Sequence, residues 1–197
     1  MTIPRTNILV EGHAIVSADG MIVSADGMIA DRDGAMPPKL RNDADWRIFQ
    51  AALDRAALVV LGRIGHMRHP NPGRRRLVLT RSVADLQADP LDSRASYWNP
   101  AGLDIAGVLD RLGITEGTVA VTGGTGAFDL FLPWYDRFLL SEVRELELPD
   151  GIPCFTKGHP RFTLPGAGFE ARDMELIGRG VVQTNWMRAA KSGQPPA

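Results

Sequence analysis

A glycine-rich turn is the first feature of the sequence that could do chemistry. Gly123, Gly124 and Gly126 follow the apolar run Val119–Val121 and precede a stretch with helical spacing. A turn between a buried strand and a helix presents backbone N–H groups that can hold a diphosphate. Such a turn also needs glycine for its own backbone geometry, so both interpretations stay open. The spacing matches neither the Gly-x-Gly-x-x-Gly pattern nor the P-loop with its lysine.

A basic run between Gly62 and Arg81 is the second feature, because it contains no acidic residue. The pattern predicts either an anion-binding site or a solvated basic loop. His66 and His69 are three residues apart, but no acidic or thiol ligand lies near them in the sequence, so we expect no metal site. The arginines of the run are Arg63, Arg68, Arg74, Arg75, Arg76 and Arg81.

The bulk composition is that of an ordinary globular protein. The 197 residues are 44% hydrophobic and 23% charged, which predicts one domain over residues 1–190 and a disordered tail over residues 191–197. No apolar run approaches the roughly 18 to 20 residues of a spanning helix, and residues 1–7 are too polar for a signal peptide. A net charge of −1 argues against nucleic-acid and membrane-surface binding. We therefore expect a cytoplasmic protein.

Cys154 is the single cysteine and lies in the apolar segment Ile152–Phe155. It can form no internal disulfide, which agrees with a reducing compartment. Its neighbours predict an inert, buried thiol.

Short apolar runs alternate with helical patterns up to about residue 143. The apolar spacing over residues 43–58 predicts a helix capped by Asn42 or Asp43. A second helix is expected from Asn99 to Leu112, with Gly113 as its stop, and a third around residues 128–132. Strands are predicted over residues 7–17, 59–61, 77–79, 119–121 and 137–143.

This alternation predicts an α/β fold of three layers, with a mainly parallel sheet covered on both faces and right-handed crossovers. The pattern changes after Glu145. Phe162–Leu164 and Val181–Trp186 have the composition of strands, and no convincing helix separates them. We expect antiparallel strands at the edge of the sheet.

Residues 16–22 are repeated without change as residues 23–29. A single tandem copy of seven residues cannot form a repeat architecture, so it is a local insertion. An odd insertion would reverse the alternation of a continuing strand, so we expect a bulge or a looped-out copy.

Five segments follow one another in the order of a known family pattern. Together they resemble the dihydrofolate reductases and the related pyrimidine reductases of riboflavin synthesis. The pyrimidine reductases include the reductase domain of bifunctional deaminase-reductases. The match spans most of residues 7–143. Its most specific part is the diglycine turn followed without a gap by the next helix and strand. The segments are Ser24–Ala30, Ala35–Pro37, Val60–Arg63, Pro72–Ser82 and Val121–Val143.

The resemblance implies a dihydrofolate reductase-like fold with NADPH as cofactor. Arginines would pair with the 2′-phosphate through planar, bidentate contacts. The nicotinamide would lie beside Ala30 and Met36. The adenosine side would be held by Gly62, Arg63, Thr80, Arg81 and Ser82, and the diphosphate by Gly123, Gly124, Thr125, Gly126 and Ala127.

In this family a carboxylate early in the first helix binds the amino-pyrimidine edge of the substrate, and a hydroxyl on a later strand supports it. Counting from Leu40 favours Asp43, whereas the usual four-residue step from the acid to an aromatic favours Asp45 before Phe49. Both stay candidates. Their structural alternatives are an N-cap for Asp43 and first-turn dipole matching for Asp45. Ser141 would be the supporting hydroxyl.

The remaining substrate contacts are implied at Arg74, which would hold a carboxylate or a ribose phosphate, and at Phe49 and Phe128. The sequence departs from the family pattern at Pro38, where many members have Trp, at Gly65, where they have Thr, and at Phe128, where they have Tyr. These departures concern the substrate more than the cofactor.

The resemblance therefore implies an NADPH-dependent reductase of a pteridine or a pyrimidine-type compound, such as dihydrofolate or a ribosylaminouracil phosphate of the riboflavin pathway. The alternative is a non-catalytic nucleotide-binding or regulatory protein on the same fold. We expect a small-molecule substrate, no nucleic acid and no membrane, and the riboflavin branch implies a homodimer.

Overall fold

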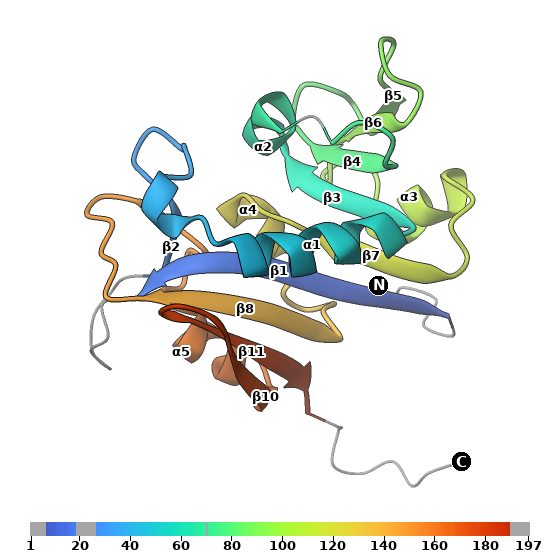
Figure 1. The fold of residues 1–197 in the computed structure, drawn as a ribbon. Coiled ribbons are helices and arrows are strands. Elements are labelled where there is room, and N and C mark those ends of the chain that lie inside the picture. Colours follow the sequence, from blue (N-terminus) through green and yellow to red (C-terminus); the bar gives the residue numbers. More distant parts are fainter. Residues whose placement is uncertain (1–6, 19–26, 70, 190–197) are drawn as a thin grey trace, which may run out of the picture.

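A nine-stranded sheet forms the centre of the computed structural model, which describes residues 7–18, 27–69 and 71–189. Its strands are β1 (Ile8–Ala18), β3 (Leu58–Gly62), β4 (Arg76–Leu79), β5 (Leu86–Ala88), β6 (Ala95–Trp98), β7 (Gly117–Val121), β8 (Arg137–Arg144), β10 (Phe169–Gly178) and β11 (Val181–Arg188). They lie in the order β10-β11-β8-β1-β7-β3-β4-β6-β5 (Figure 1). Pairing is parallel from β8 through β6, and antiparallel for β10 and β11 at one edge and for β5 at the other.

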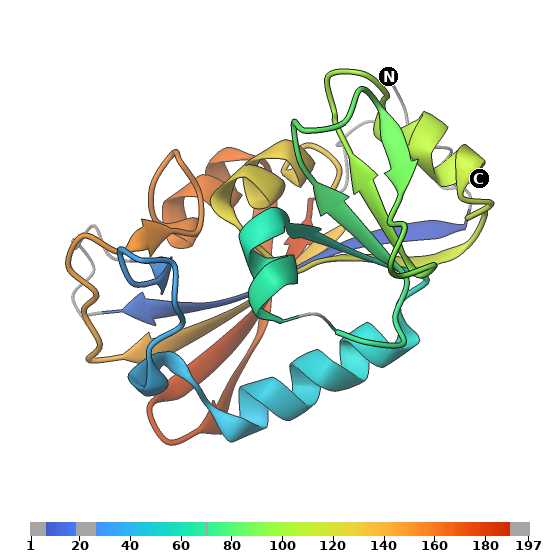
Figure 2. The same ribbon diagram turned by 90° about the horizontal axis from the view of Figure 1, so that it is seen from above.

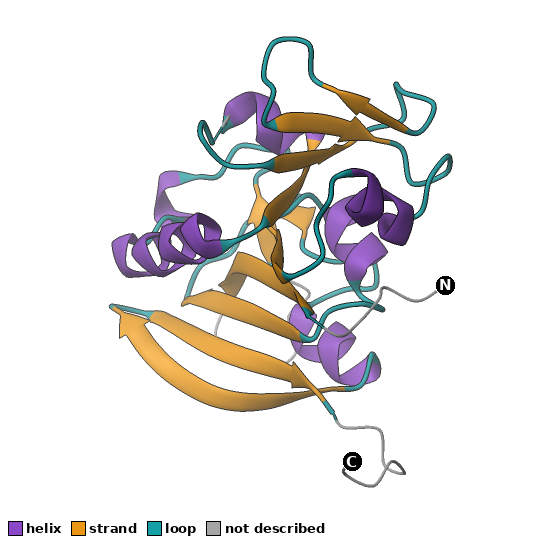
Figure 3. Cartoon of the chain, turned by 90° about the vertical axis from the view of Figure 1, so that its right-hand side faces the viewer, coloured by secondary structure: helices purple, strands orange, loops and turns teal. Residues whose placement is uncertain are grey.

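Helices cover both faces of the sheet (Figure 2; Figure 3). α1 (Asp43–Arg55) lies on one face, and α3 (Ile105–Arg111), α4 (Thr125–Phe131) and α5 (Pro160–Gly166) lie on the other. α2 (Arg63–Arg68) follows β3, and the 3-10 helix η1 (Pro38–Leu40) precedes α1. Two short strands, β2 (Met28–Ala30) and β9 (Ile152–Pro153), pair outside the main sheet. The predicted three-layer α/β fold with antiparallel strands near the C-terminus is confirmed.

β1 separates two environments, because successive side chains of a strand point to opposite faces. Val10 and Val16 enter the large apolar core. Glu11 and His13 are buried on the opposite face, where the His13 ring contacts Phe49 of α1. The central strand therefore carries apolar side chains toward one helical layer and charged ones toward the other.

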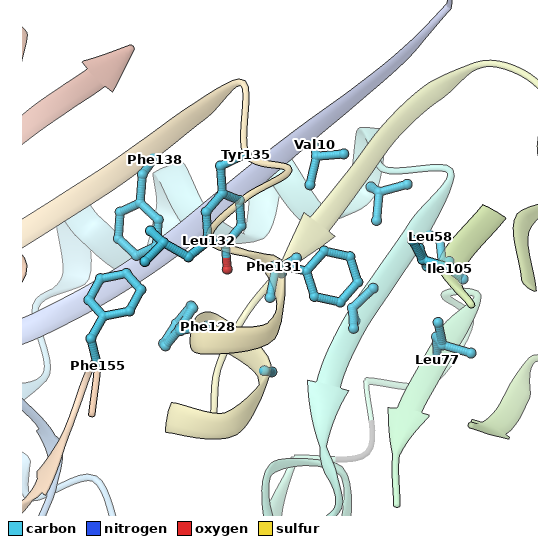
Figure 4. Packing of buried hydrophobic residues seen from close by; sticks show 14 of the residues in the cluster. Val10, Leu58, Leu77, Ile105, Phe128, Phe131, Leu132, Tyr135, Phe138 and Phe155 are labelled. Carbon is cyan, nitrogen blue, oxygen red and sulfur yellow. The ribbon is translucent and has the colours of Figure 1, made fainter. Parts of the chain in front are cut away.

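An aromatic cluster fills the core between β8 and α4 (Figure 4). The Phe138 ring centroid lies 5.5 Å from that of Phe128, 5.3 Å from that of Tyr135 and 5.4 Å from that of Phe155. These are the offset and edge-to-face distances that aromatic pairs prefer. A Cβ at Gly12 would lie 2.1 Å from the Phe138 ring. The cluster therefore requires glycine where it meets β1.

The prediction of a strand at Phe162–Leu164 is wrong, because these residues belong to α5. His159 caps this helix, since its Nδ1 accepts a hydrogen bond from the Arg161 N–H at 3.1 Å. Pro160 occupies the first turn, where its missing N–H costs nothing. Its buried residues are Pro160 and those three and four positions later, which is helical spacing. The sequence pattern did not indicate this helix, because it is only seven residues long and its N-cap is a histidine.

The predicted start of the second helix at Asn99 is also wrong. Asn99 instead accepts a hydrogen bond within a separate turn. α3 begins at Ile105, because the Asp104 carboxylate accepts the N–H three residues on at 2.7 Å and caps it there. The predicted stop at Gly113 is confirmed by its φ of +64°.

Asn42, and not Asp43, caps α1, because its Oδ1 accepts hydrogen bonds from two backbone N–H groups at 3.0 and 3.1 Å. α1 ends at Arg55 instead of continuing to Leu58, which begins β3. The other predicted strands and the helix after the glycine turn are all present. α2 was not predicted, because its six residues contribute no buried side chain to mark a helical face.

Cys154 is unpaired and buried, as expected, and burial raises the pKa of its thiol well above the ordinary value. Most of the duplicated segment and the C-terminal tail lie outside the described residues. Among its described residues, Gly27 of the second copy donates its N–H to the carbonyl of Ser17 in the first copy at 3.1 Å.

Replacing Gly12 by alanine should lower the free energy of unfolding by about 1 to 3 kcal/mol, because the new Cβ forces the Phe138 ring out of the cluster. Urea denaturation measures the loss. Gly166→Ala in α5 is the control, since a Cβ there meets no atom within 4 Å. It should leave stability unchanged or raise it by up to about 1 kcal/mol. Equal losses in both variants would contradict the account of the aromatic cluster.

Candidate functional site

The first part of the candidate site lies at the carboxyl ends of β7, β3 and β4, which are neighbours in the sheet. Gly123 and Gly124 follow β7 with φ of +133° and +75°, values that favour glycine. Gly62 ends β3 and donates its N–H to the Gly123 carbonyl at 3.0 Å. A Cβ at Gly62 would lie 3.7 Å from that oxygen. The two segments form one backbone surface at the edge where ligands of open α/β sheets bind.

The six arginines of the basic run fall into two groups. Arg63 and Arg81 are exposed, and neither has a side-chain hydrogen bond or ion pair to another described residue. Arg63 directly follows β3 and Arg81 lies two residues after β4, so both lie at the same edge as the glycine turn. The other four are bound by the protein: Arg68 by the Asp33 carbonyl, Arg74 by Asp54, Arg75 by the Leu112 carbonyl and Arg76 by Asp92.

The basic run is therefore only partly a solvated loop. It includes α2 and β4 as well as residues outside these elements, and the Arg76 side chain is almost fully buried. Thr80 and Ser82 flank Arg81, their hydroxyl oxygens lie 2.8 Å apart, and the Ser82 N–H donates to Thr80 Oγ1 at 3.1 Å. This turn presents a guanidinium group and two hydroxyls together, which suits a phosphate.

The predicted diphosphate residues after Gly124 have different environments. Gly126 is exposed, and a Cβ there would meet no atom within 4 Å. Ala127 is buried in the core. Thr125 donates its hydroxyl to the Pro153 carbonyl at 2.5 Å, which ties the glycine turn to β9. Among these three, Gly126 is open to solvent, and the other two side chains contact the protein.

The second part of the site lies under the first turn of α1. Asp45 forms a side-chain hydrogen bond with Ser141 of β8. Ser141 Oγ in turn accepts a hydrogen bond from Gln183 Nε2 at 3.0 Å. Asp43 is exposed, and its backbone carbonyl accepts from Arg47 Nε at 3.2 Å. Of the two candidate acids, the fold brings Asp45 to Ser141.

The environment of Asp45 favours its protonated form. Burial raises its pKa, and the Ser141 hydrogen bond and the charge of His13 lower it only in part, so the net shift is upward. A carboxyl group with a raised pKa keeps its proton closer to neutral pH. Such a group can donate a proton or a hydrogen bond to a ligand.

His13 belongs to a buried chain of charges beside Asp45. His13 Nε2 lies 3.3 Å from Glu11 Oε2, and Glu11 Oε1 lies 2.5 Å from Arg137 Nη2. The His13 ring packs edge-on against Phe49, with centroids 6.1 Å apart. Burial raises the pKa of Glu11, but its contacts with His13 and Arg137 outweigh burial and leave the pKa below its ordinary value. An ionised Glu11 therefore holds the imidazole in place.

Residues 31–36 connect the two parts of the site. The Asp31 carboxylate accepts two backbone N–H groups of this turn at 3.1 and 2.7 Å. Arg68 of α2 donates to the Asp33 carbonyl at 2.7 Å, so the turn is joined to the helix that follows β3. Ala30 is buried in β2 before the turn, and Met36 packs against an apolar cluster after it.

The three predicted substrate residues lie apart. Phe49 is half-buried against His13. Phe128 is only 1% exposed and packs inside the aromatic cluster, where its ring lies 3.7 Å from the Cβ position of Gly123. It therefore supports the glycine turn from the core. Arg74 lies against α1, where it is bound by Asp54.

The sequence interpretation missed Glu11, His13 and Gln183. A signal was present for the first two, because a buried strand of otherwise apolar residues rarely carries charged groups unless they are paired. Gln183 gave no signal, since only the antiparallel pairing of β11 with β8 sets it opposite Ser141.

Two kinds of feature are missing from the described residues. No three histidine, cysteine, aspartate or glutamate side chains gather there in a way that could hold a metal ion. Nor is any helix in those ranges long and apolar enough to cross a membrane.

Comparison with known proteins shows similarity in structure alone. No family model matches the chain, and no curated protein matches its sequence. A candidate riboflavin biosynthesis protein from Shewanella sp. PV-4 superposes with a TM-score of 0.60 at 17% identity, covering 94% of this chain and 100% of that one. Dihydrofolate reductase from Enterococcus faecalis, complexed with NADP(H) and RAB-propyl, gives 0.61 at 18% identity over 92% and 97%.

A third similar structure is the diaminohydroxyphosphoribosylaminopyrimidine deaminase/5-amino-6-(5-phosphoribosylamino)uracil reductase of Thermotoga maritima. Its TM-score is 0.66 at 15% identity, and the match covers 94% of this chain but 58% of that protein. This chain therefore spans somewhat more than half of the bifunctional enzyme. With TM-scores of 0.60 to 0.66 over 92 to 94% of the chain, the three similarities show that the chain has the dihydrofolate reductase-like fold.

Proposed function

We propose that this protein is an NADPH-dependent reductase of a pteridine or pyrimidine-type heterocycle. One observation carries the proposal. The fold gathers a side-chain-free glycine surface and two arginines with no partner among the described residues at the edge formed by β7, β3 and β4, and it sets a partly buried carboxyl group of raised pKa against the neighbouring strands β1 and β8. An anion-binding edge next to a proton donor is what a hydride-transfer enzyme needs.

The cofactor half of the proposal rests on exposed glycine backbone and on two arginines that no other described residue binds. Gly62, Gly123 and Gly124 would receive the diphosphate against backbone. Arg63 and Arg81 would pair with the 2′-phosphate, with Thr80 and Ser82 as further donors. When bound, NADPH supplies the hydride. The protein supplies position and the exclusion of water.

The substrate half rests on Asp45. Its pKa is raised, so its protonated form, which can donate a hydrogen bond to a ring nitrogen or amino-carbonyl edge, persists to higher pH than in an ordinary aspartate. Ser141 and Gln183 orient the carboxyl group from the sheet side, and His13 lies beside it on the chain of charges. The carboxyl group is thus supported on both sides before any substrate arrives.

The first test measures NADPH binding through the fluorescence of its nicotinamide. Arg81→Ala should weaken NADPH roughly 10- to 100-fold and NADH less than about threefold, because only NADPH carries the 2′-phosphate. Arg55→Ala, which removes an exposed arginine of α1, is the matched control and should change neither affinity. Equal weakening of both nucleotides by Arg81→Ala would rule out the assigned role.

Consumption of NADPH distinguishes a reductase from the alternative, a non-catalytic nucleotide-binding protein. NADPH consumption is followed with dihydrofolate, with the riboflavin-pathway ribosylaminopyrimidinone phosphate and with related heterocycles. Asp45→Asn should lower kcat/KM roughly 100-fold or more at pH 7, and Asp43→Asn less than about threefold. NADPH binding without consumption by any of these compounds would favour the alternative.

The raised pKa of Asp45 also makes a prediction for stability. Because the folded state binds this proton more tightly than the unfolded state, ionisation of Asp45 destabilises the fold as pH rises above the ordinary value of 3.8. Asp45→Asn should therefore raise the free energy of unfolding at pH 7, and the gain should vanish below that value. Urea denaturation across this range measures it, with Asp43→Asn as the control. A gain that does not depend on pH would contradict the burial of an ionisable group.

A further inference from the structure

The helix that carries Arg63, α2, contacts the sheet through one side chain. It has six residues, and none of them is buried. Gly65 has no side chain, and every other residue of the helix except His66 is exposed. The His66 side chain is only 13% exposed. Arg68 binds the turn over residues 31–36, which is not part of the sheet. The imidazole of His66 is therefore the side chain that attaches α2 to the sheet.

This imidazole packs against β6, which lies two places away in the sheet from β3, the strand that leads into α2. Its ring lies edge-on to that of Tyr97, with centroids 6.2 Å apart and planes at 88°. The Tyr97 hydroxyl donates to Asp89 Oδ2 at 3.0 Å, and His66 Nε2 faces the same oxygen at 4.0 Å, too far for a hydrogen bond. His66 Nδ1 is buried and has no hydrogen-bond partner among the described residues. Ring packing therefore holds the imidazole in place.

The His66 ring is uncharged at neutral pH. Burial lowers its pKa, and the charge of Arg76 lowers it further. The carboxylates of Asp89 and Asp92 raise it only in part, so the pKa lies below the ordinary value of 6.5. A neutral ring packs under α2 without the cost of burying a charge.

The turn that carries Arg81 is fixed to the same strand. β4 pairs with β6 in parallel register, and the Thr80 N–H extends this pairing by donating to the Trp98 carbonyl at 2.9 Å. Arg81 follows directly. Arg63 precedes His66 by three residues, which is about one turn of helix. Both arginines are therefore positioned relative to β6, one through the imidazole and the other through the backbone.

We infer that His66 is a positioning residue for the cofactor phosphate. By holding α2 against β6, it keeps Arg63 where both guanidinium groups reach one anion. The inference rests on the proposed function, because His66 acts only through Arg63 and makes no contact with the cofactor itself. Charge-assisted hydrogen bonds of a guanidinium depend on alignment, so a small rotation of α2 weakens them.

Nucleotide binding to the full chain tests this inference at about pH 8, where a phosphate monoester is fully ionised and an ordinary histidine is neutral. His66→Ala should weaken NADPH roughly 5- to 10-fold and NADH less than about twofold, because NADH lacks the 2′-phosphate. His69→Ala, which removes an exposed imidazole directly after α2, is the matched control and should change neither affinity.

Two further variants separate positioning from a purely structural role. In Arg63→Ala, the added change His66→Ala should weaken NADPH less than about twofold, because no guanidinium at the start of α2 remains to be positioned. His66→Phe keeps an aromatic ring against Tyr97 and should bind NADPH within about twofold of the unchanged protein.

Three results would overturn the inference: equal weakening of NADPH and NADH by His66→Ala, an undiminished loss when His66→Ala is added to Arg63→Ala, or a loss in His66→Phe as large as in His66→Ala. Unchanged NADPH binding in His66→Ala would also overturn it and would leave the proposed cofactor site standing. Failure of the unchanged protein to bind NADPH would instead defeat the proposed function, and this inference with it.

Discussion

The register of β1 between β7 and β8 is the constraint on which both parts of the site depend. Gly12 lies opposite Val121, the last residue of β7, and opposite Phe138 of β8. At this level of the sheet the aromatic cluster contacts β1 through the Phe138 ring, and the glycine turn begins directly after Val121. A slip of one residue would turn Glu11 and His13 into the apolar core and would bring a bulky side chain under the Phe138 ring.

This register also explains why charged groups can be buried under α1. Once Glu11 and His13 face the helix, Glu11 must find a counter-charge, and the parallel pairing of β1 with β8 sets Arg137 directly opposite it. Asp45 then enters from the helix, where Ser141 and the His13 imidazole meet it. The layer between sheet and helix is polar because its charged members pair with one another.

The arginines illustrate how a fold assigns roles to residues of one type. Arg68, Arg74, Arg75 and Arg76 each bind a carbonyl or a carboxylate of the chain, so they connect elements. Arg63 and Arg81 have no such bond to a described residue. Both follow parallel strands at the edge where the backbone is open. The support for a bound cofactor therefore comes from donors that no described residue uses, and the support for a small substrate comes from a partly buried acid.

Local chemistry in the sequence was enough to predict β1, β3, β4, β7, β8 and β11, the glycine turn, the stop at Gly113 and the arrangement in three layers. Apolar runs and glycine positions act over a few residues, and the sheet follows from their alternation. Local signals failed for α5, because a seven-residue helix capped by histidine resembles a short strand in composition. They failed for the start of α3, because Asn99 caps a turn as readily as a helix.

The tertiary structure alone decided which residues meet. Asp43 and Asp45 are the same residue type in the same first helical turn. The rotation of the helix exposes Asp43 and sets Asp45 partly buried against Ser141, nearly a hundred positions away. Gln183 reaches Ser141 only through an antiparallel pairing. The sequence likewise showed six arginines in one basic run, whereas their partners, and hence which of them are free, depend on carboxylates and carbonyls brought from other segments. Pairings of this range have no local signal, because they arise only when strands and helices pack.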